Sequence, residues 1–357
     1  MPSRSTCLSF LLAAACAAAF VACDHAGKAK TGPRNDGTAG PTARSSWSIA
    51  SSSVTSSSSS SVTTTSSSSS WSSARLRSQV NCTPDASFPA SFALPEASAA
   101  AEVELTPGVR EILVVSDSGN HGAALAWRLP SGPVRSLTLP LDAAASDDIE
   151  GMAWLRDRAR PGDRQGALYT LTSSGAVRRF VPDGHGGLRR DQDAYAIGGA
   201  PWACGDLGAV NCGKNYEGLC LRPRSAPGRC AGYAASKRAS QLVCLDFAGD
   251  RLAVDTVHRP IALDLAAPFG AHDGVLSDCA FGADPGPAQA TLLITTNVYG
   301  GSSTYVVNES TGAPLSLDMG GTMSNEAVAV DRDGALYQFL DDNGAASAGL
   351  RATCRGW

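Results

Sequence analysis

Four acidic residues recur in a repeated motif, and each is followed by a small residue. The four pairs are Glu150-Gly151, Glu217-Gly218, Asp278-Cys279 and Glu326-Ala327. Carboxylates that gather in one place repel one another, so their charge must be offset by a cation, by arginine or lysine, or by proton uptake. Ligand sets made of oxygen alone favour calcium over zinc. If the fold brings the four acids together, the motif predicts a calcium site formed by Glu150, Glu217, Asp278 and Glu326.

Another set of polar residues stands where strand-like segments end. Asp117 follows the segment EILVVS (111–116), and Asn297 follows TLLITT (291–296). When the copies are aligned on their closing glycines, Asp117 falls where Ser173 and Asp342 stand. We therefore expect a ligand to contact a set that consists of Asp117, Ser173, Lys237, Asn297, Asp341 and Asp342.

The chain carries none of the short motifs typical of common catalytic sites. It has no Gly-x-Ser-x-Gly elbow, His-Glu-x-x-His pair, phosphate loop or dinucleotide fingerprint. We expect His121, in a polar loop, to be solvated. A group of arginines could hold phosphate, but such residues are more often solvated at strand edges and in loops: Arg178, Arg179, Arg189 and Arg190. The formal net charge of -4 argues against a nucleic-acid partner.

The elements that must position these residues are strands. From residue 81 to residue 357, short apolar segments alternate with Gly, Pro, Asp and Ser, and no window has sustained helical periodicity. The clearest segments of strand length are 111–116, 168–171, 177–181, 241–247, 291–296, 303–307 and 335–339. These features predict an all-β domain.

The repeated motif and the room available predict a β-propeller. Roughly 275 residues are too many for a single sandwich, and the recurring acid-containing motif indicates radial repetition. A four-stranded blade takes about 40 to 50 residues, so we expect six blades. Five or seven blades are the alternatives, and a pair of β-sandwiches is less favoured.

Propeller topology would place both polar sets on one face. In an antiparallel hairpin, the start of one strand and the end of the next lie at the same end of the sheet. The small residue after each acid suits a crowded axis, where backbones approach closely. We therefore expect an arc of carboxylates around the mouth of the central channel. The alternative is that these acids only cap strands by hydrogen bonding.

The segments DIEGMA (148–153) and LYTLTSS (168–174), with the later pair Glu217-Gly218 and the segment NEA (325–327), resemble propeller proteins of the "esterase-like activity of phytase" and SdiA-regulated families. The resemblance covers most of residues 100–345 and implies a propeller, calcium binding in some members and phosphoester hydrolysis in others. A β-propeller phytase would have an Asp-rich site with several lysines, whereas the domain has only Lys214 and Lys237. This departure argues against phytase activity.

Eight cysteines lie within the predicted domain: Cys82, Cys204, Cys212, Cys220, Cys230, Cys244, Cys279 and Cys354. An even number in an exported protein indicates disulfides, and no Cys-x-x-Cys pair supports metal binding instead. Cys82 and Cys354 stand at the two ends of a ring that must close, so we expect them to pair. We also expect a disulfide between Cys204 and Cys212.

The N-terminal segment predicts export. Residues 1–22 combine Arg4 with an apolar run that is too short to span a bilayer comfortably, as in a signal peptide. The junction Val21-Ala22-Cys23 resembles a bacterial lipobox, which predicts that Cys23 is lipidated and anchors the chain to a membrane of the bacterial cell envelope. A soluble secreted protein is the alternative. Residues 23–80 include a Ser/Thr-rich tract, which we expect to be a disordered linker.

Two classes of function fit these features. One is a calcium-bearing binding module that recognises a small molecule or a surface ligand. The other is a metal-dependent phosphoesterase of the phytase-like type. We favour binding, because the sequence shows no nucleophile and base pair and because lysines for phosphate are scarce.

Overall fold

The described part of the chain consists of strands, turns and loops. The computed structural model describes residues 80–156, 165–198, 204, 206–223, 226–263, 275–282, 291–298, 301–318, 325–340 and 346–355. Every regular element within these ranges is a β-strand, which confirms the predicted all-β class. No helix in these ranges is long and apolar enough to cross a membrane. Cys23 and the Ser/Thr-rich tract lie outside the described residues.

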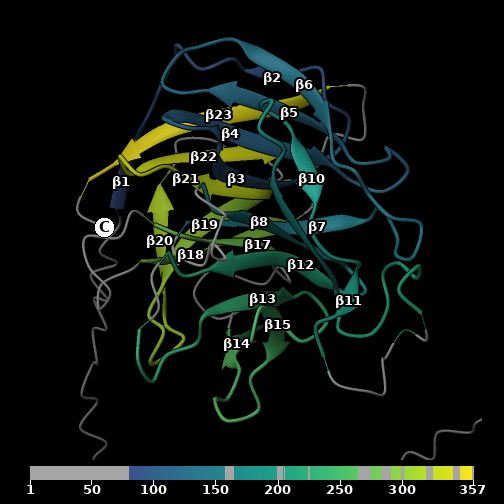
Figure 1. Cartoon of the computed structure of the whole chain (residues 1–357). Coiled ribbons are helices and arrows are strands. Elements are labelled where there is room, and N and C mark those ends of the chain that lie inside the picture. The colour runs from purple at the N-terminus through teal and green to yellow at the C-terminus, as the bar shows by residue number, and fades with distance from the viewer. Residues whose placement is uncertain are drawn as a thin grey trace, which may run out of the picture. The chain divides into compact units, whose positions relative to one another are not determined.

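Four sheets, which form five blades of a propeller, follow one another along the described part of the chain (Figure 1). Blade 1 contains β3 (Ala97–Thr106), β4 (Val109–Ser116), β5 (Ala123–Arg128) and β6 (Val134–Thr138). Blade 2 contains β7 (Ile149–Leu155), β8 (Ala167–Thr172) and β9 (Ala176–Pro182), with β10 (Leu188–Arg190) and β11 (Tyr195–Ala196) both pairing with β9. Blade 3 contains β12 (Tyr216–Leu221), β13 (Gly232–Ser236) and β14 (Gln241–Ala248), with β15 (Arg251–Val254) and β16 (Ile261–Ala262) both pairing with β14.

The last two blades share one continuous sheet. Blade 4 contains β17 (Val275–Phe281), β18 (Leu292–Val298), β19 (Gly301–Val307) and β20 (Pro314–Asp318). Blade 5 contains β21 (Asn325–Val330), β22 (Ala335–Leu340), β23 (Ser347–Cys354) and the N-terminal strand β1 (Val80–Pro84), with β2 (Ser91–Phe92) also pairing with β23. Strand β1 joins the two blades, because it pairs with β23 on one side and with β20 on the other.

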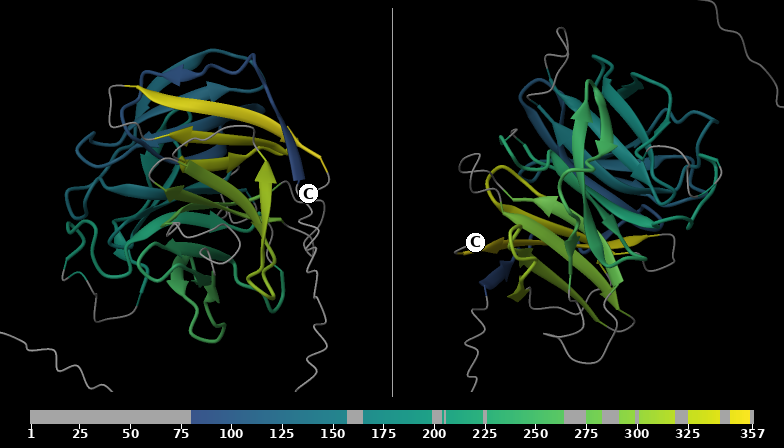
Figure 2. Two further views of the ribbon diagram at one scale, coloured as in Figure 1. Left: turned by 180° about the vertical axis from the view of Figure 1, so that it is seen from behind. Right: turned by 90° about the horizontal axis from the view of Figure 1, so that it is seen from below.

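The first strands of the five blades form a closed ring. Each of β3, β7, β12 and β17 contacts the first strand of the next blade, and β21 contacts β3. These strands lie in the middle of the fold, and the later strands of each blade extend outwards (Figures 1 and 2). The propeller is therefore confirmed, but the described residues form five blades and the expectation of six is wrong. The connections are longer than a 40-to-50-residue blade allows; for example, β11 ends at Ala196 and β12 begins only at Tyr216.

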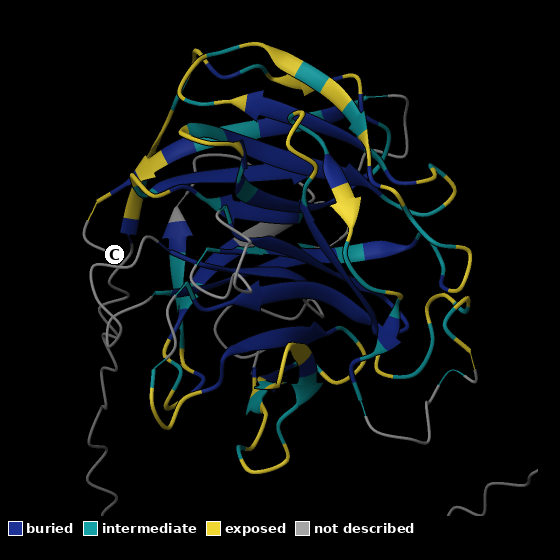
Figure 3. Ribbon diagram, in the orientation of Figure 1, coloured by how far each residue is buried: buried dark blue, intermediate teal, exposed yellow. Residues whose placement is uncertain are grey.

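Apolar clusters fill the spaces between neighbouring blades. Leu219 and Val243 of blade 3 pack with Tyr169 of blade 2, and comparable clusters join each of the other four pairs of neighbours. The inner strands are consequently buried on both faces, whereas exposed residues lie mainly on the outer strands and turns (Figure 3). Burial on both faces explains why the sequence shows continuous apolar segments rather than strict alternation.

Disulfides reinforce the ring. Cys82 of β1 pairs with Cys354 of β23, and Cys204 pairs with Cys212, so both predicted bridges are confirmed. Two further bridges are Cys220–Cys279, which joins the inner strands of blades 3 and 4, and Cys230–Cys244 within blade 3. The Cys82–Cys354 bridge spans 272 residues of sequence and ties the N-terminal strand to the last one.

Two glycines allow the inner strands to approach closely. A Cβ atom at Gly151 would lie 2.3 Å from the backbone nitrogen of Leu219, and one at Gly218 would lie 2.8 Å from the Cα of Asp278. Both distances are shorter than real Cβ contacts, and the obstructing atoms belong to backbone. In blades 2 and 3 the glycine of the repeated motif is therefore required by contact between successive inner strands.

We predict that Gly151→Ala lowers the free energy of unfolding by about 1 to 3 kcal/mol, because overpacking forces backbone to shift. Gly198→Ala is the matched control, since a Cβ there meets nothing within 4 Å. Chemical denaturation of both variants would measure the difference. Equal stability of the two variants would contradict the close packing at the axis.

Candidate functional site

Three of the four repeated acids, Glu150, Glu217 and Glu326, occupy bulges at the start of the inner strands. In all five inner strands the pairing with the next strand of the blade shifts by one residue near its beginning. The residues that the shift leaves outside the ladder are Ser98, Glu150, Glu217, Ser277 and Glu326. A bulge redirects a side chain away from the regular alternation of the strand. Blades 2, 3 and 5 thus place a glutamate at the same position on one end of the ring, which we call the site face.

Five carboxyl groups meet on the site face, and we call them the carboxylate cluster: Asp117, Asp148, Glu150, Glu217 and Glu326. Asp117, Asp148 and Glu150 each offer an oxygen, and these oxygens lie within 4.8 Å of one another. Burial raises the pKa of Glu150 well above its usual range, and repulsion from the other four carboxyls raises it further. The geometry therefore concentrates negative charge around Glu150.

Lys237 supplies a positive charge to one side of the cluster. Its Nζ lies 2.8 Å from Oε2 of Glu217, and the Asn215 side-chain amide donates a hydrogen bond to Oε1 at 2.8 Å. Burial raises the pKa of Glu217 to about 7, although Lys237 acts in the opposite direction. The side chain of Lys237 is 40% exposed, whereas that of Glu217 is 4% exposed. Lys237 therefore lies between the buried carboxyl of Glu217 and the solvent.

Asn297 brings blade 4 into the site. Its side-chain amide donates a hydrogen bond to Oε1 of Glu326 in blade 5. Asn297 follows the segment 291–296, as the sequence indicated, but the strand β18 continues through it to Val298. Residues from all five blades thus contribute to the face or to its supports.

Ser173 supports the cluster from beneath. Its hydroxyl is buried, donates a hydrogen bond to Asp148 and accepts one from the backbone N–H of Asn211 at 2.8 Å. Burial raises the pKa of Asp148, and the Ser173 hydrogen bond lowers it in part. Ser173 therefore holds Asp148 in place. Asp148 was not among the predicted site residues, although it stands two positions before Glu150 in the same motif.

Asp278 is not the equivalent of the three glutamates. The bulge in β17 leaves out Ser277, so Asp278 occupies the position of Gly151, Gly218 and Ala327. It is 1% exposed, and its two oxygens accept hydrogen bonds at 2.7 Å from the backbone N–H groups of Cys279 and Val328. Asp278 thus links the inner strands of blades 4 and 5. The sequence prediction aligned Asp278 with Glu150, Glu217 and Glu326, but the residue at their position in β17 is Ser277.

Asp341 and Asp342 lie outside the described residues, so their predicted role stays a prediction. His121 is solvated as expected, with a side chain that is 93% exposed. The solvated interpretation is wrong for two arginines. Arg178 is buried and donates hydrogen bonds at 2.7 Å to the carbonyls of residues 145 and 146, and buried Arg179 pairs with Asp191. Both arginines are structural supports of blade 2.

Comparisons with known proteins do not identify a family for this chain. No family model matches the chain, and no curated protein matches it. Among solved structures, it is similar to a virginiamycin B lyase from Staphylococcus aureus, with 12% identity, a TM-score of 0.34 and coverage of 71% of this chain and 67% of the lyase. An auxiliary nutrient binding protein from Bacteroides thetaiotaomicron has 12% identity, a TM-score of 0.35 and coverage of 69% of this chain and 57% of that protein.

A protein from Lactobacillus plantarum has 12% identity, a TM-score of 0.40 and coverage of 69% of this chain and 78% of that protein. The chain therefore spans little more than half the length of the nutrient-binding protein and two thirds of the lyase. At these scores, no activity or ligand transfers from the compared proteins.

We predict that the metal-free domain loses stability as the pH rises from about 5 to about 8. The folded-state pKa of Glu217, about 7, exceeds the ordinary 4.5. A raised pKa gives stability that is fully present below the unfolded-state pKa and is lost as pH rises through the folded-state pKa. The expected contribution of Glu217 is about 3 kcal/mol.

Denaturation of wild type and Glu217→Gln over this pH range would measure that contribution. The variant carries a permanently neutral side chain, so its stability should fall less steeply with pH. If both proteins show the same pH dependence, the raised pKa of Glu217 is refuted.

Proposed function

We propose that this chain is a surface-displayed binding protein whose site face holds a divalent cation, calcium, through which it binds a ligand. The observation that carries the proposal is the carboxylate cluster, in which oxygens of Asp117, Asp148 and Glu150 lie within 4.8 Å of one another. Glu217 and Glu326 add two further carboxyls, and Lys237 provides a positive charge beside Glu217. A bound cation would offset the remaining repulsion.

The donor set favours calcium. Calcium takes six to eight oxygen ligands in flexible geometry, whereas zinc prefers nitrogen and sulfur as well as fewer ligands. Asp117 and Glu150 are partly exposed, so they can share a cation with oxygens of a ligand that arrives from solvent. Lys237, while still paired with Glu217, and Asn297, which donates to Glu326, each carry a further N–H that can donate a hydrogen bond to such a ligand. An oxygen-rich small molecule or surface polymer fits this arrangement.

The direction of β1 supports display of the site face away from an anchor. Asn325, at the start of β21, lies on the site face, whereas Val330 lies at the opposite end of the strand. Through the antiparallel pairs β21–β22, β22–β23 and β23–β1, the first residue of β1, Val80, lies at that opposite end. We propose that Cys23 anchors the chain to a bacterial envelope membrane, and a tether entering at Val80 would leave the site face free to meet its ligand.

A phosphoesterase of the phytase-like type is the second candidate, because clustered carboxylates can also hold catalytic metal ions. Lys237, however, already pairs with Glu217, and burial of that carboxyl makes the pair costly to separate. Phosphate would therefore depend on the bound cation for its binding. We favour ligand binding without hydrolysis, because binding requires fewer functional groups from the described residues than catalysis does.

We predict that calcium raises the thermal midpoint of the domain by several degrees. A ligand at about 100 times its dissociation constant contributes about 2.7 kcal/mol to the stability of the state that binds it. The combined change Glu150→Gln and Glu217→Gln should abolish the rise. Asp193→Asn, at a side chain that is 90% exposed and pairs with Arg190, is the matched control and should keep it.

Two outcomes would overturn this proposal. A thermal midpoint that calcium does not change, or a rise that survives in the double variant, would mean that the acids only stabilise strands. Phosphate release from a panel of phosphomonoesters that depends on Glu150 and Glu217 would instead establish the phosphoesterase.

The anchor has its own test. We predict that Cys23→Ser releases the expressed protein from the membrane fraction and removes the mass of the lipid, because the thiol is the proposed site of modification. Cys16→Ser, in the apolar run, should change neither property of the mature protein. A Cys23→Ser protein that stays membrane-bound with unchanged mass would exclude lipidation at this residue.

A further inference from the structure

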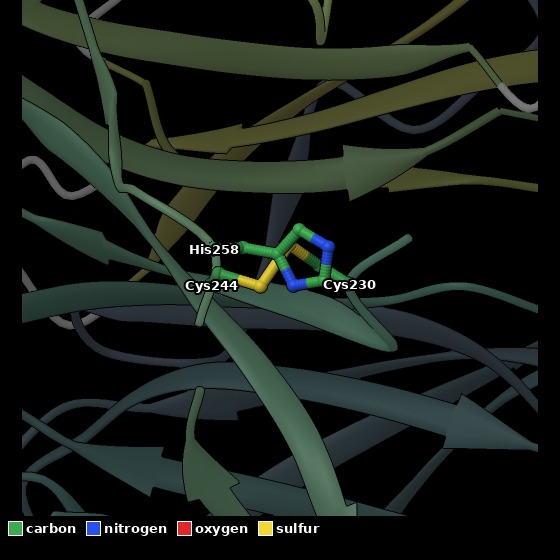
Figure 4. A group of neighbouring side chains, drawn as sticks. All are labelled: Cys230, Cys244 and His258. Carbon is green, nitrogen blue, oxygen red and sulfur yellow. A yellow bond between two sulfur atoms is a disulfide. The ribbon is translucent and has the colours of Figure 1, made fainter. Parts of the chain in front are cut away.

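A second group of metal-binding side chains lies in blade 3 around a disulfide. One ligand atom from each of Cys230, Cys244 and His258 lies within 4.8 Å of the other two (Figure 4). The two cysteines are bonded to each other, and both are buried, with exposures of 6% and 1%. The His258 side chain is 41% exposed and provides the solvent-facing side of the group.

Asp255 fixes the orientation of the imidazole. Its Oδ2 hydrogen-bonds to Nδ1 of His258 and lies 3.6 Å from Sγ of Cys244. Its Oδ1 accepts the backbone N–H of Val257 at 2.6 Å, and its own N–H donates to the Cys244 carbonyl at 2.9 Å. The turn that carries His258 is therefore held against β14 by hydrogen bonds that do not involve the sulfur atoms.

This group is far along the strands from the carboxylate cluster. Cys244 pairs with Tyr233, which is next to Gly232, and Gly232 pairs with Leu221 at the end of β12. Glu217 stands near the beginning of that same strand. The cysteines and His258 thus belong to the end of blade 3 opposite the site face, and the group is independent of the proposed calcium site.

The side chains fit a metal that prefers sulfur and nitrogen. Zinc is bound by cysteine thiolates, histidine nitrogen and carboxylate oxygen, and a carboxylate commonly orients the ligating imidazole. The disulfide withholds both sulfur atoms from such a role, because the thiolate is the metal ligand. Removing the bond would therefore complete a ligand set whose remaining members are already in position.

We propose that reduction of the Cys230–Cys244 disulfide converts this group into a zinc-class metal site, with the two thiolates and His258 as ligands and Asp255 orienting the imidazole. A dithiol reductant supplies two electrons and two protons, so the disulfide becomes two thiols while the dithiol becomes a disulfide. The metal ion then displaces the two thiol protons. The result is a site that exists only in the reduced protein.

Cobalt binding to the full chain tests the proposal. The protein is reduced under native conditions with a phosphine, its fold is checked by circular dichroism, and Co²⁺ is added without oxygen. We expect one Co²⁺ per chain to give the thiolate-to-cobalt charge-transfer absorption of a two-thiolate site, an absorption that Co²⁺ at the carboxylate cluster cannot give. The oxidised protein should lack this absorption, because it has no thiolate in the group.

Variants separate this group from the other reduced cysteines. His258→Ala should weaken Co²⁺ binding at least tenfold, and Asp255→Asn should weaken it about 10- to 100-fold. His185→Ala, at an exposed histidine in the β9–β10 turn of blade 2, is the control and should leave it unchanged. Cys230→Ser combined with Cys244→Ser should remove the charge-transfer absorption.

Three results would overturn the proposal. The first is charge-transfer absorption of equal strength in the double serine variant. The second is equal affinity in His258→Ala and His185→Ala, a comparison that does not depend on whether the double variant folds. The third is a Cys230–Cys244 bond that is reduced only when the domain unfolds.

Discussion

The close approach of the inner strands at the axis is the constraint from which the rest of this propeller follows. Gly151 leaves no room for a Cβ beside the backbone of Leu219, and Gly218 leaves none beside Asp278. Strands this close leave no room between them for larger side chains. In blades 2 and 3 a bulge just before the glycine directs the larger side chain, that of Glu150 or Glu217, away from the contact. Because the bulge lies at the same end of every inner strand, it gathers one side chain from each blade on a single face.

The five blades use this common position in two ways. In blades 1 and 4 the bulged residue is serine, and its hydroxyl donates a hydrogen bond to a carbonyl of the next inner strand: Ser98 to Ile149, and Ser277 to Asn325. In blades 2, 3 and 5 it is glutamate, whose longer side chain reaches the carboxylate cluster. Two blades therefore use the position to hold the ring together, and three use it to concentrate charge. Burial, together with repulsion between the carboxyls, raises the pKa of Glu150 and Glu217, and such raised pKa values are typical of sites that act on ligands.

Much of this arrangement could be predicted from sequence because it depends on local repetition. The recurrent pair of an acid and a small residue predicted the shared face, and the positions of Cys82 and Cys354 predicted the closing bridge. The number of blades could not be predicted in this way. The sequence does not distinguish a long connection, such as the one between Ala196 and Tyr216, from the strands of a further blade. Asp278 shows another limit of prediction from sequence. Because a bulge shifts the register by one residue, an acid next to the expected position can accept hydrogen bonds from backbone N–H groups instead of joining the carboxylate cluster.

Calcium binding at the proposed site would release protons from the carboxylate cluster. Isothermal titration calorimetry with calcium near pH 6.5, repeated in buffers of different ionisation enthalpy, measures binding and proton release together. We expect one calcium ion per chain with release of protons, because the raised pKa of Glu217, about 7, leaves that carboxyl partly protonated until the cation binds. Absence of binding, or binding whose heat does not depend on the buffer, would contradict this expectation.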